Sequence, residues 1–166
     1  MTAPAELRSY LVANGADRQP HGRRFLLDHL EGVHRILVGA KSEPDVCAAG
    51  LFHSVYGTAL YKPRLVDTAR RDEIQRLIGA RAEEIVWAFC TLQMRAKALD
   101  LSLQCGNHDW LAGKVACRHC EPDRLWSDLI RVECANLLEQ HALQEFPSIG
   151  RHAREIGIVD AEGFLV

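Results

Sequence analysis

The sequence predicts an all-α fold built as a single domain. Apolar residues recur with the period of an amphipathic helix along nearly the whole chain, and no run alternates as a half-buried strand does. The chain has 166 residues, of which 48% are hydrophobic, and this is enough to bury one core. No internal repeat or low-complexity stretch divides it, so we expect residues 1–166 to form one domain.

The N-terminal half is expected to hold five helices. The first is closed by Asn14 and Gly15, a usual C-terminal signal, and the second carries apolar residues at helical spacing. The third begins where Ser42 offers an N-cap and Pro44 stands just inside the helix. A surface loop follows over residues 57–67. The helices are expected at residues 5–13, 23–38, 44–56, 67–78 and 80–92, with Gly79 separating the last two.

The C-terminal half is expected to begin with an irregular segment, residues 100–122, that is rich in Cys and His. Pro122 and Asp123 then start a long helix that runs to Leu143. A short last helix is expected over residues 148–156.

Composition excludes several classes of function. The formal net charge of −2 argues against nucleic-acid binding, which requires a basic face. No segment approaches the roughly 18 apolar residues of a membrane span, and the N-terminus shows no basic-then-apolar leader, so we expect a cytoplasmic protein. The six cysteines are then expected to be reduced thiols or metal ligands. For partners, the sequence favours a small-molecule substrate, argues against nucleic acid and membrane, and leaves a homodimer open.

The most informative feature is a pair of histidines on consecutive predicted helices. His29 has apolar neighbours on an amphipathic helix, and His53 ends the apolar run that begins at Ala48, before Gly57 breaks the helix. Two helical histidines that converge in an all-helical core indicate a metal site or an acid–base site.

These segments carry a family resemblance. His29, followed on the next helix by residues 49–54 (Ala-Gly-Leu-Phe-His-Ser), resembles the HD-domain superfamily of metal-dependent phosphohydrolases and their di-iron oxygenase relatives. The segments at 26–32, 50–58 and 133–140 also resemble an uncharacterised domain family related to the HD fold. The resemblance implies an HD-like helical bundle.

In that superfamily a first-helix His, a His-Asp pair and a late Asp bind the metal. The resemblance places His29 at the first ligand and His53 at the His of the pair. Ser54 stands in place of the paired Asp, and Asn136 in place of the late Asp. Both offer neutral oxygens, which bind a hard divalent ion less tightly than carboxylates do.

Three interpretations follow from this departure. In the first, His21, Glu84 or Glu133 completes a pocket with His29 and His53 that holds iron or manganese, since two histidines and one carboxylate suit ferrous iron. In the second, the same two histidines serve as acid and base in a metal-free lyase, cyclase or isomerase. In the third, the pocket binds a small molecule without catalysis.

We take the first interpretation as the main expectation: a metal-dependent hydrolase or oxygenase that acts on a small polar metabolite. Tyr56, just past His53, is placed at the pocket mouth. Glu133, Asn136 and Gln140 share one face of the long helix, and the first two join the expected catalytic group.

A separate metal motif lies in the irregular segment. Cys105 and His108 form a Cys-x2-His pair, and Cys117 and Cys120 form a Cys-x2-Cys pair. Each spacing lets two ligands of a tight turn reach one tetrahedral ion, so these four residues predict a structural zinc site. A loop of solvated thiols and imidazoles is the alternative.

Overall fold

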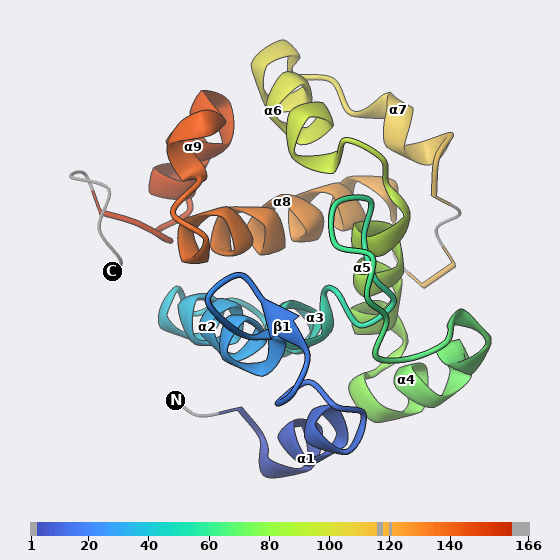
Figure 1. The fold of residues 1–166 in the computed structure, drawn as a ribbon. Helices are drawn as coiled ribbons and strands as arrows, with labels where there is room; N and C mark the ends of the chain where they lie inside the picture. The colour runs from blue at the N-terminus through green and yellow to red at the C-terminus, as the bar shows by residue number, and fades with distance from the viewer. Residues whose placement is uncertain (1–2, 116–117, 120, 161–166) are drawn as a thin grey trace.

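The computed structural model describes residues 3–115, 118–119 and 121–160, and these form an all-α structure with one small hairpin (Figure 1). The predicted fold class is confirmed. The α-helices are α1 (Ala5–Ala13), α2 (Leu26–Gly39), α3 (Pro44–Phe52), α4 (Arg71–Ile78), α5 (Ala80–Thr91), α6 (Arg95–Cys105), α7 (Asp109–Ala112), α8 (Pro122–Glu139) and α9 (Pro147–Glu155). Two 3-10 helices, η1 (Thr68–Arg70) and η2 (Leu143–Glu145), and two strands, β1 (Pro20–His21) and β2 (Arg24–Phe25), complete the described part. None of its helices is both long and apolar enough to cross a membrane.

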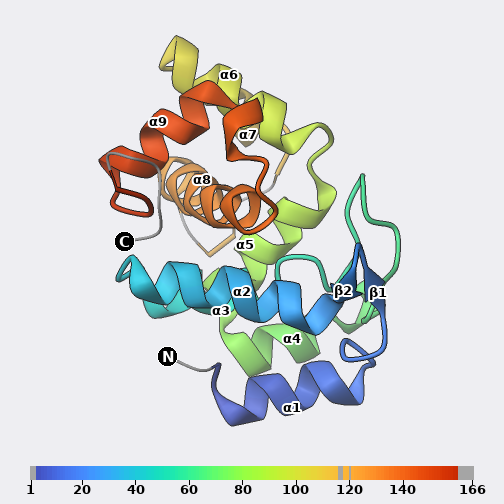
Figure 2. The ribbon, with the colours of Figure 1, turned by 60° about the vertical axis from the view of Figure 1, so that its left-hand side comes forward.

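Helix α8 runs through the middle of the molecule and organises the packing. Helices α2 and α3 pack on one side of α8, and α9 packs on the other with α6 against it (Figure 1). Helices α1 and α4 lie beyond α2 and α3, away from α8 (Figure 2). Helix α5 contacts both α3 and α8, so these three helices and α2 enclose the core around the C-terminal end of α3.

The α2–α3 contact is close because a glycine lies in it. A Cβ built at Gly50 would stand 2.2 Å from Leu37 Cδ1, so a side chain at this position would force the Leu37 side chain or one of the helices to shift. This close approach brings the C-terminal end of α3 against the middle of α2.

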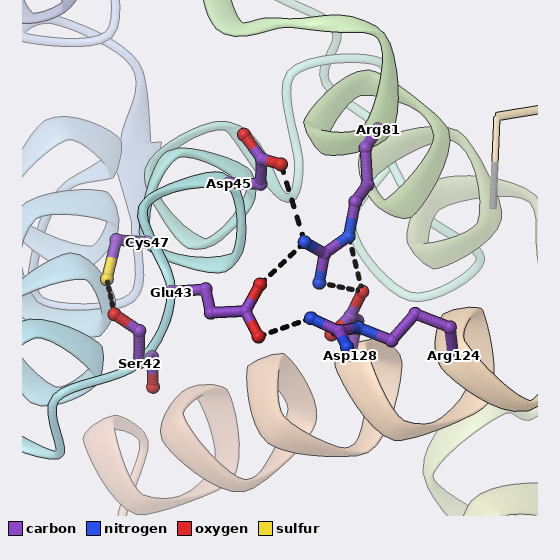
Figure 3. A network of polar contacts seen from close by, with 7 residues as sticks. All are labelled: Ser42, Glu43, Asp45, Cys47, Arg81, Arg124 and Asp128. Atoms are coloured by element: carbon purple, nitrogen blue, oxygen red, sulfur yellow. Dashed lines mark hydrogen bonds and ion pairs between the residues drawn. The ribbon is translucent and has the colours of Figure 1, made fainter.

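An ion network ties the start of α3 to α5 and α8 (Figure 3). Arg81 of α5 bonds Glu43 Oε2 and Asp128 Oδ2, each at 2.7 Å, and reaches Asp45 Oδ2 at 3.4 Å. Arg124 bonds Glu43 and lies 3.6 Å from Asp128, which closes the network. The network fixes the N-terminal end of α3, opposite to the end that carries His53.

Several boundaries differ from the sequence prediction. Helix α2 begins at Leu26 rather than at residue 23, because residues 20–25 form the antiparallel β1–β2 hairpin. Helix α3 ends at Phe52, so that His53 is its C-cap residue and the prediction of a helix reaching Tyr56 is wrong.

The segment 100–122, predicted to be irregular, contains the end of α6 and the whole of α7. Gly106, with φ +64°, ends α6 in the left-handed conformation that glycine adopts without strain. Helix α8 ends at Glu139 rather than at residue 143, since His141 has φ 57° and cannot continue it.

Candidate functional site

The two histidines predicted to converge face each other in the core. His29 Nε2 lies 3.1 Å from His53 Nε2, and the exposed fractions of the two residues are 1% and 2%. His29 projects from the buried face of α2, whereas His53 lies in the turn that ends α3. The close α2–α3 packing at Gly50 therefore brings the two imidazoles into contact.

The outer nitrogen of each ring is already hydrogen-bonded. His53 Nδ1 lies 2.7 Å from the carbonyl oxygen of Gly50, which can only accept, so this nitrogen carries a proton. His29 Nδ1 bonds the carboxylate of Glu139 on α8, and Arg24 bonds the same carboxylate from the hairpin. Burial raises the pKa of Glu139, but the bonds from His29 and Arg24 outweigh it and leave this pKa below its usual value. Glu139 is therefore an ionised acceptor.

The two Nε2 atoms that face each other consequently need a proton or a metal ion between them. Burial, followed by the charge of His29, holds the pKa of His53 well below its usual value, so His53 is neutral and its Nε2 presents a lone pair. His29 also donates its Nδ1 proton, and a neutral His29 would turn a second lone pair toward the first. Either a proton on His29 Nε2 or a metal ion removes this repulsion.

A glycine makes room for Glu139. A Cβ built at Gly32 on α2 would stand 2.6 Å from Glu139 Oε1 and 2.8 Å from its Cγ. Gly32 lies three residues after His29, on the same side of the helix. The carboxylate can thus approach the histidine only because position 32 has no side chain.

His21 covers the pair from the hairpin side. Its ring stacks on His29 with centroids 4.4 Å apart, and Tyr61 packs edge-on against it at 4.8 Å. Burial, followed by the charge of His29, lowers the pKa of His21 to about 4, and its buried Nδ1 has no hydrogen-bond partner among the described residues. A stacked ring lies over His29 rather than in line with its Nε2, so His21 acts here as a neutral cover.

A second polar chain lies on the other side of His53. Phe89 packs edge-on against His53 at 4.9 Å, and the Arg95 guanidinium lies 3.3 Å from the centroid of the Phe89 ring. Arg95 pairs with Glu133 at 2.9 Å, and the Asn136 amide bonds the same carboxylate at 3.4 Å. The predicted residues Glu133 and Asn136 therefore bond each other, and Glu133 pairs with Arg95 rather than with the histidines. Gln140 extends this chain by donating to the Asn136 side-chain oxygen at 2.6 Å.

Tyr56 and Glu84 have other partners. The Tyr56 hydroxyl donates to Glu83 Oε1 at 3.1 Å, and Arg71 pairs with the same carboxylate at 2.7 Å. Burial, reinforced by the charge of Glu83, raises the pKa of Tyr56, so its hydroxyl stays protonated. Glu84 accepts the backbone N–H groups at 118–119, which positions this part of the chain on α5.

The predicted zinc motif falls partly outside the described residues, since Cys117 and Cys120 lie there. Cys105 is a free, exposed thiol. His108 bonds Asp123 at 2.9 Å and stacks on Trp126 with centroids 4.5 Å apart. In the part of the chain that the structure describes, no group of three His, Cys, Asp or Glu residues is arranged to hold a metal ion.

Glu139, Arg24 and Gly32 contribute to the site but are not among the residues predicted from the sequence. Glu139 follows Asn136 by three residues, so helical spacing places it on the face already assigned to the site and was a usable signal. Arg24 and Gly32 matter only through their contacts with Glu139, and these contacts depend on the packing of α2 against α8.

The fold and the site together define an all-α protein with a buried pair of histidines, one of which is hydrogen-bonded to a carboxylate. The chain belongs to the family described as Domain of unknown function (DUF6817), which matches residues 10–94. The matched region contains His21, His29 and His53, whereas Glu139 lies beyond it. No curated protein and no solved structure matches the chain.

Proposed function

We propose that this chain is an HD-like enzyme that binds one divalent iron or manganese ion between His29 and His53. Its substrate would be a small polar metabolite, which it hydrolyses or oxidises. The proposal rests on the two Nε2 atoms that face each other. The Nδ1 atom of each ring already donates a hydrogen bond, so only the Nε2 atoms are left to bind an ion. This arrangement requires a cation, and neutral imidazole is a common ligand for iron; manganese would depend more on oxygen ligands from water and substrate.

The separation of the two nitrogens fits a shared ion. Metal–nitrogen bonds of about 2.0–2.1 Å, at tetrahedral or octahedral angles, put two ligand nitrogens about 2.8–3.4 Å apart. The observed separation of 3.1 Å lies within this range. Because no third protein ligand joins the pair among the described residues, water and substrate would supply the remaining ligands.

The surrounding residues hold the two imidazoles ready. The Glu139 carboxylate and the Gly50 carbonyl fix which ring nitrogen of each histidine carries the proton, as the hydrogen-bond acceptors behind histidine ligands do at many metal sites. His21 and Tyr61 exclude water from one face of His29. The ion itself would supply Lewis-acid or redox chemistry.

Metal content measured by mass spectrometry tests this proposal. Untagged protein would be purified without chelator, incubated anaerobically with Fe(II) or Mn(II), and desalted. We expect about one ion per wild-type chain and little in the His53→Ala variant, because one imidazole holds a divalent ion weakly. His152→Ala is the matched control, because His152 lies on α9, bonded to Glu155.

The Cys117→Ala/Cys120→Ala variant separates this ion from any zinc in the Cys/His segment. An ion that survives in this variant and is lost in His53→Ala supports the proposal. A wild-type chain that takes up no ion, or a His53→Ala variant that keeps it, refutes the proposal.

A metal-free acid–base enzyme is the second candidate, and the ionised Glu139 beside His29 favours it. With a proton between the rings, His29 is an imidazolium paired with Glu139 and hydrogen-bonded to His53. Such a pair can exchange a proton with a substrate, as a lyase, cyclase or isomerase requires. Wild-type protein that is metal-free yet loses a substrate-dependent activity in both His29→Ala and His53→Ala would support this candidate.

A further inference from the structure

A cavity of about 320 Å³ lies beside the histidine pair but does not include it. Its lining comes from the loop after α3 and from the C-terminal half of α5. Cys90, which lines it, donates its thiol to the His53 carbonyl oxygen at 3.2 Å. The backbone at His53 therefore lies next to this cavity, while the His53 imidazole is directed to His29. A cavity of this size accommodates a small metabolite.

The charge of the lining is positive. Lys62 and Arg64 both line the cavity, and no acidic residue does so in the part of the chain that is described. Neither cation makes an ion pair or side-chain hydrogen bond with another described residue. Burial raises the pKa of Cys90 to about 12, although a backbone hydrogen bond at Tyr56 and the charges of Arg95 and Arg64 act in the opposite direction. Arg64 and Cys90 both line the cavity, so the positive charge lies on the same wall region as the buried thiol.

The rest of the lining is held in place by its own contacts. Trp87 is fixed by the Arg71 guanidinium, 3.9 Å from its ring centroid, and by Tyr56, whose ring packs edge-on at 5.9 Å. Thr58 Oγ1 accepts the Tyr61 backbone N–H at 3.0 Å, which leaves its hydroxyl proton free to donate. The walls therefore offer a fixed aromatic side chain and a hydroxyl donor near two cations that lack a described partner.

We propose that this cavity binds a small anionic metabolite through a carboxylate or phosphate group that pairs with Lys62 and Arg64. A guanidinium can bind either group with two parallel hydrogen bonds, and an ammonium adds a point charge. The inference does not depend on a metal ion at the histidine pair, since none of the three histidines of that site lines the cavity.

Isothermal titration calorimetry in a phosphate-free buffer tests the proposal, with inorganic phosphate and citrate as the two probes. We expect wild type to bind at least one probe saturably, and the probe that binds better distinguishes the two chemistries. In Lys62→Gln/Arg64→Gln, we expect a loss of affinity of at least about tenfold, since each charge-assisted hydrogen bond carries a substantial share of the binding.

The control is Lys41→Gln/Arg154→Gln, which removes the same charge from the α2–α3 turn and from α9. This control should bind as wild type does. The proposal is overturned if neither probe binds, or if the control double variant loses as much affinity as Lys62→Gln/Arg64→Gln.

Discussion

Replacing Gly32 by Ala should destabilise the protein, although the same change stabilises an ordinary helix. Alanine in place of an interior helical glycine stabilises by about 0.5–1 kcal/mol. Here the new Cβ would stand 2.6 Å from Glu139 Oε1, so the carboxylate must leave His29 and Arg24. Loss of the buried hydrogen bond between His29 and the charged carboxylate costs about 1.5–3 kcal/mol, and the pair with the exposed Arg24 adds little. The difference is a net loss of about 0.5–2.5 kcal/mol in the free energy of unfolding.

Urea denaturation of four proteins measures this effect: wild type, Gly32→Ala, Glu139→Ala and the double variant. In the Glu139→Ala background the clash is gone, so Gly32→Ala should regain its ordinary sign and stabilise by about 0.5–1 kcal/mol. The reversal of sign is the diagnostic result. A Gly32→Ala change that stabilises wild type, or that costs the same in both backgrounds, would refute the role we give to position 32.

Three other changes have expected outcomes. Arg81→Met should lower the free energy of unfolding in urea by about 1–3 kcal/mol, because Asp128, whose pKa burial already raises, loses its main partner. Burial lowers the pKa of His34, whereas in the unfolded chain it is about 6.5. The stability from a neutral His34 is therefore present above about pH 6.5 and lost as the pH falls through the folded pKa. The melting temperature of His34→Gln should accordingly fall less than that of wild type between pH 7 and pH 5. Gly57→Ala should lower the melting temperature more than Gly22→Ala: both glycines have positive φ, but only at Gly57 would the Cβ meet backbone, 3.0 Å from a carbonyl oxygen.

The helical framework was predictable from local signals. The helical spacing of apolar residues, together with Gly and Pro at the helix ends, predicted the bounds of α1, α5 and α9 to within two residues. The convergence of His29 and His53 was also predictable, because His29 has apolar neighbours on its helix and His53 directly follows the apolar run of the next helix. The β1–β2 hairpin was not, since two-residue strands carry no alternation to detect.

The partners of the histidines depended on tertiary structure. The sequence prediction placed Glu133 in the site and left out Glu139, although both carboxylates lie along one helix. Which of them meets His29 is decided by Gly32, where the missing side chain admits Glu139, and by Arg95, which pairs with Glu133. The spacing of residues within α8 cannot reveal either contact, because Gly32 lies on α2 and Arg95 lies on α6.

The loop that follows His53 connects the two polar regions of the molecule. Its Tyr61 packs on His21 and donates to the Pro20 carbonyl oxygen at 3.0 Å, which closes one face of the histidine pair. Its Lys62 and Arg64 line the neighbouring cavity. The loop returns to the end of α3, where Val55 accepts two backbone N–H groups at 2.9 and 3.1 Å. The end of α3 at His53 therefore also determines the course of the loop that follows. It directs one short segment between the two sites, so the conformation of that segment shapes a wall of both.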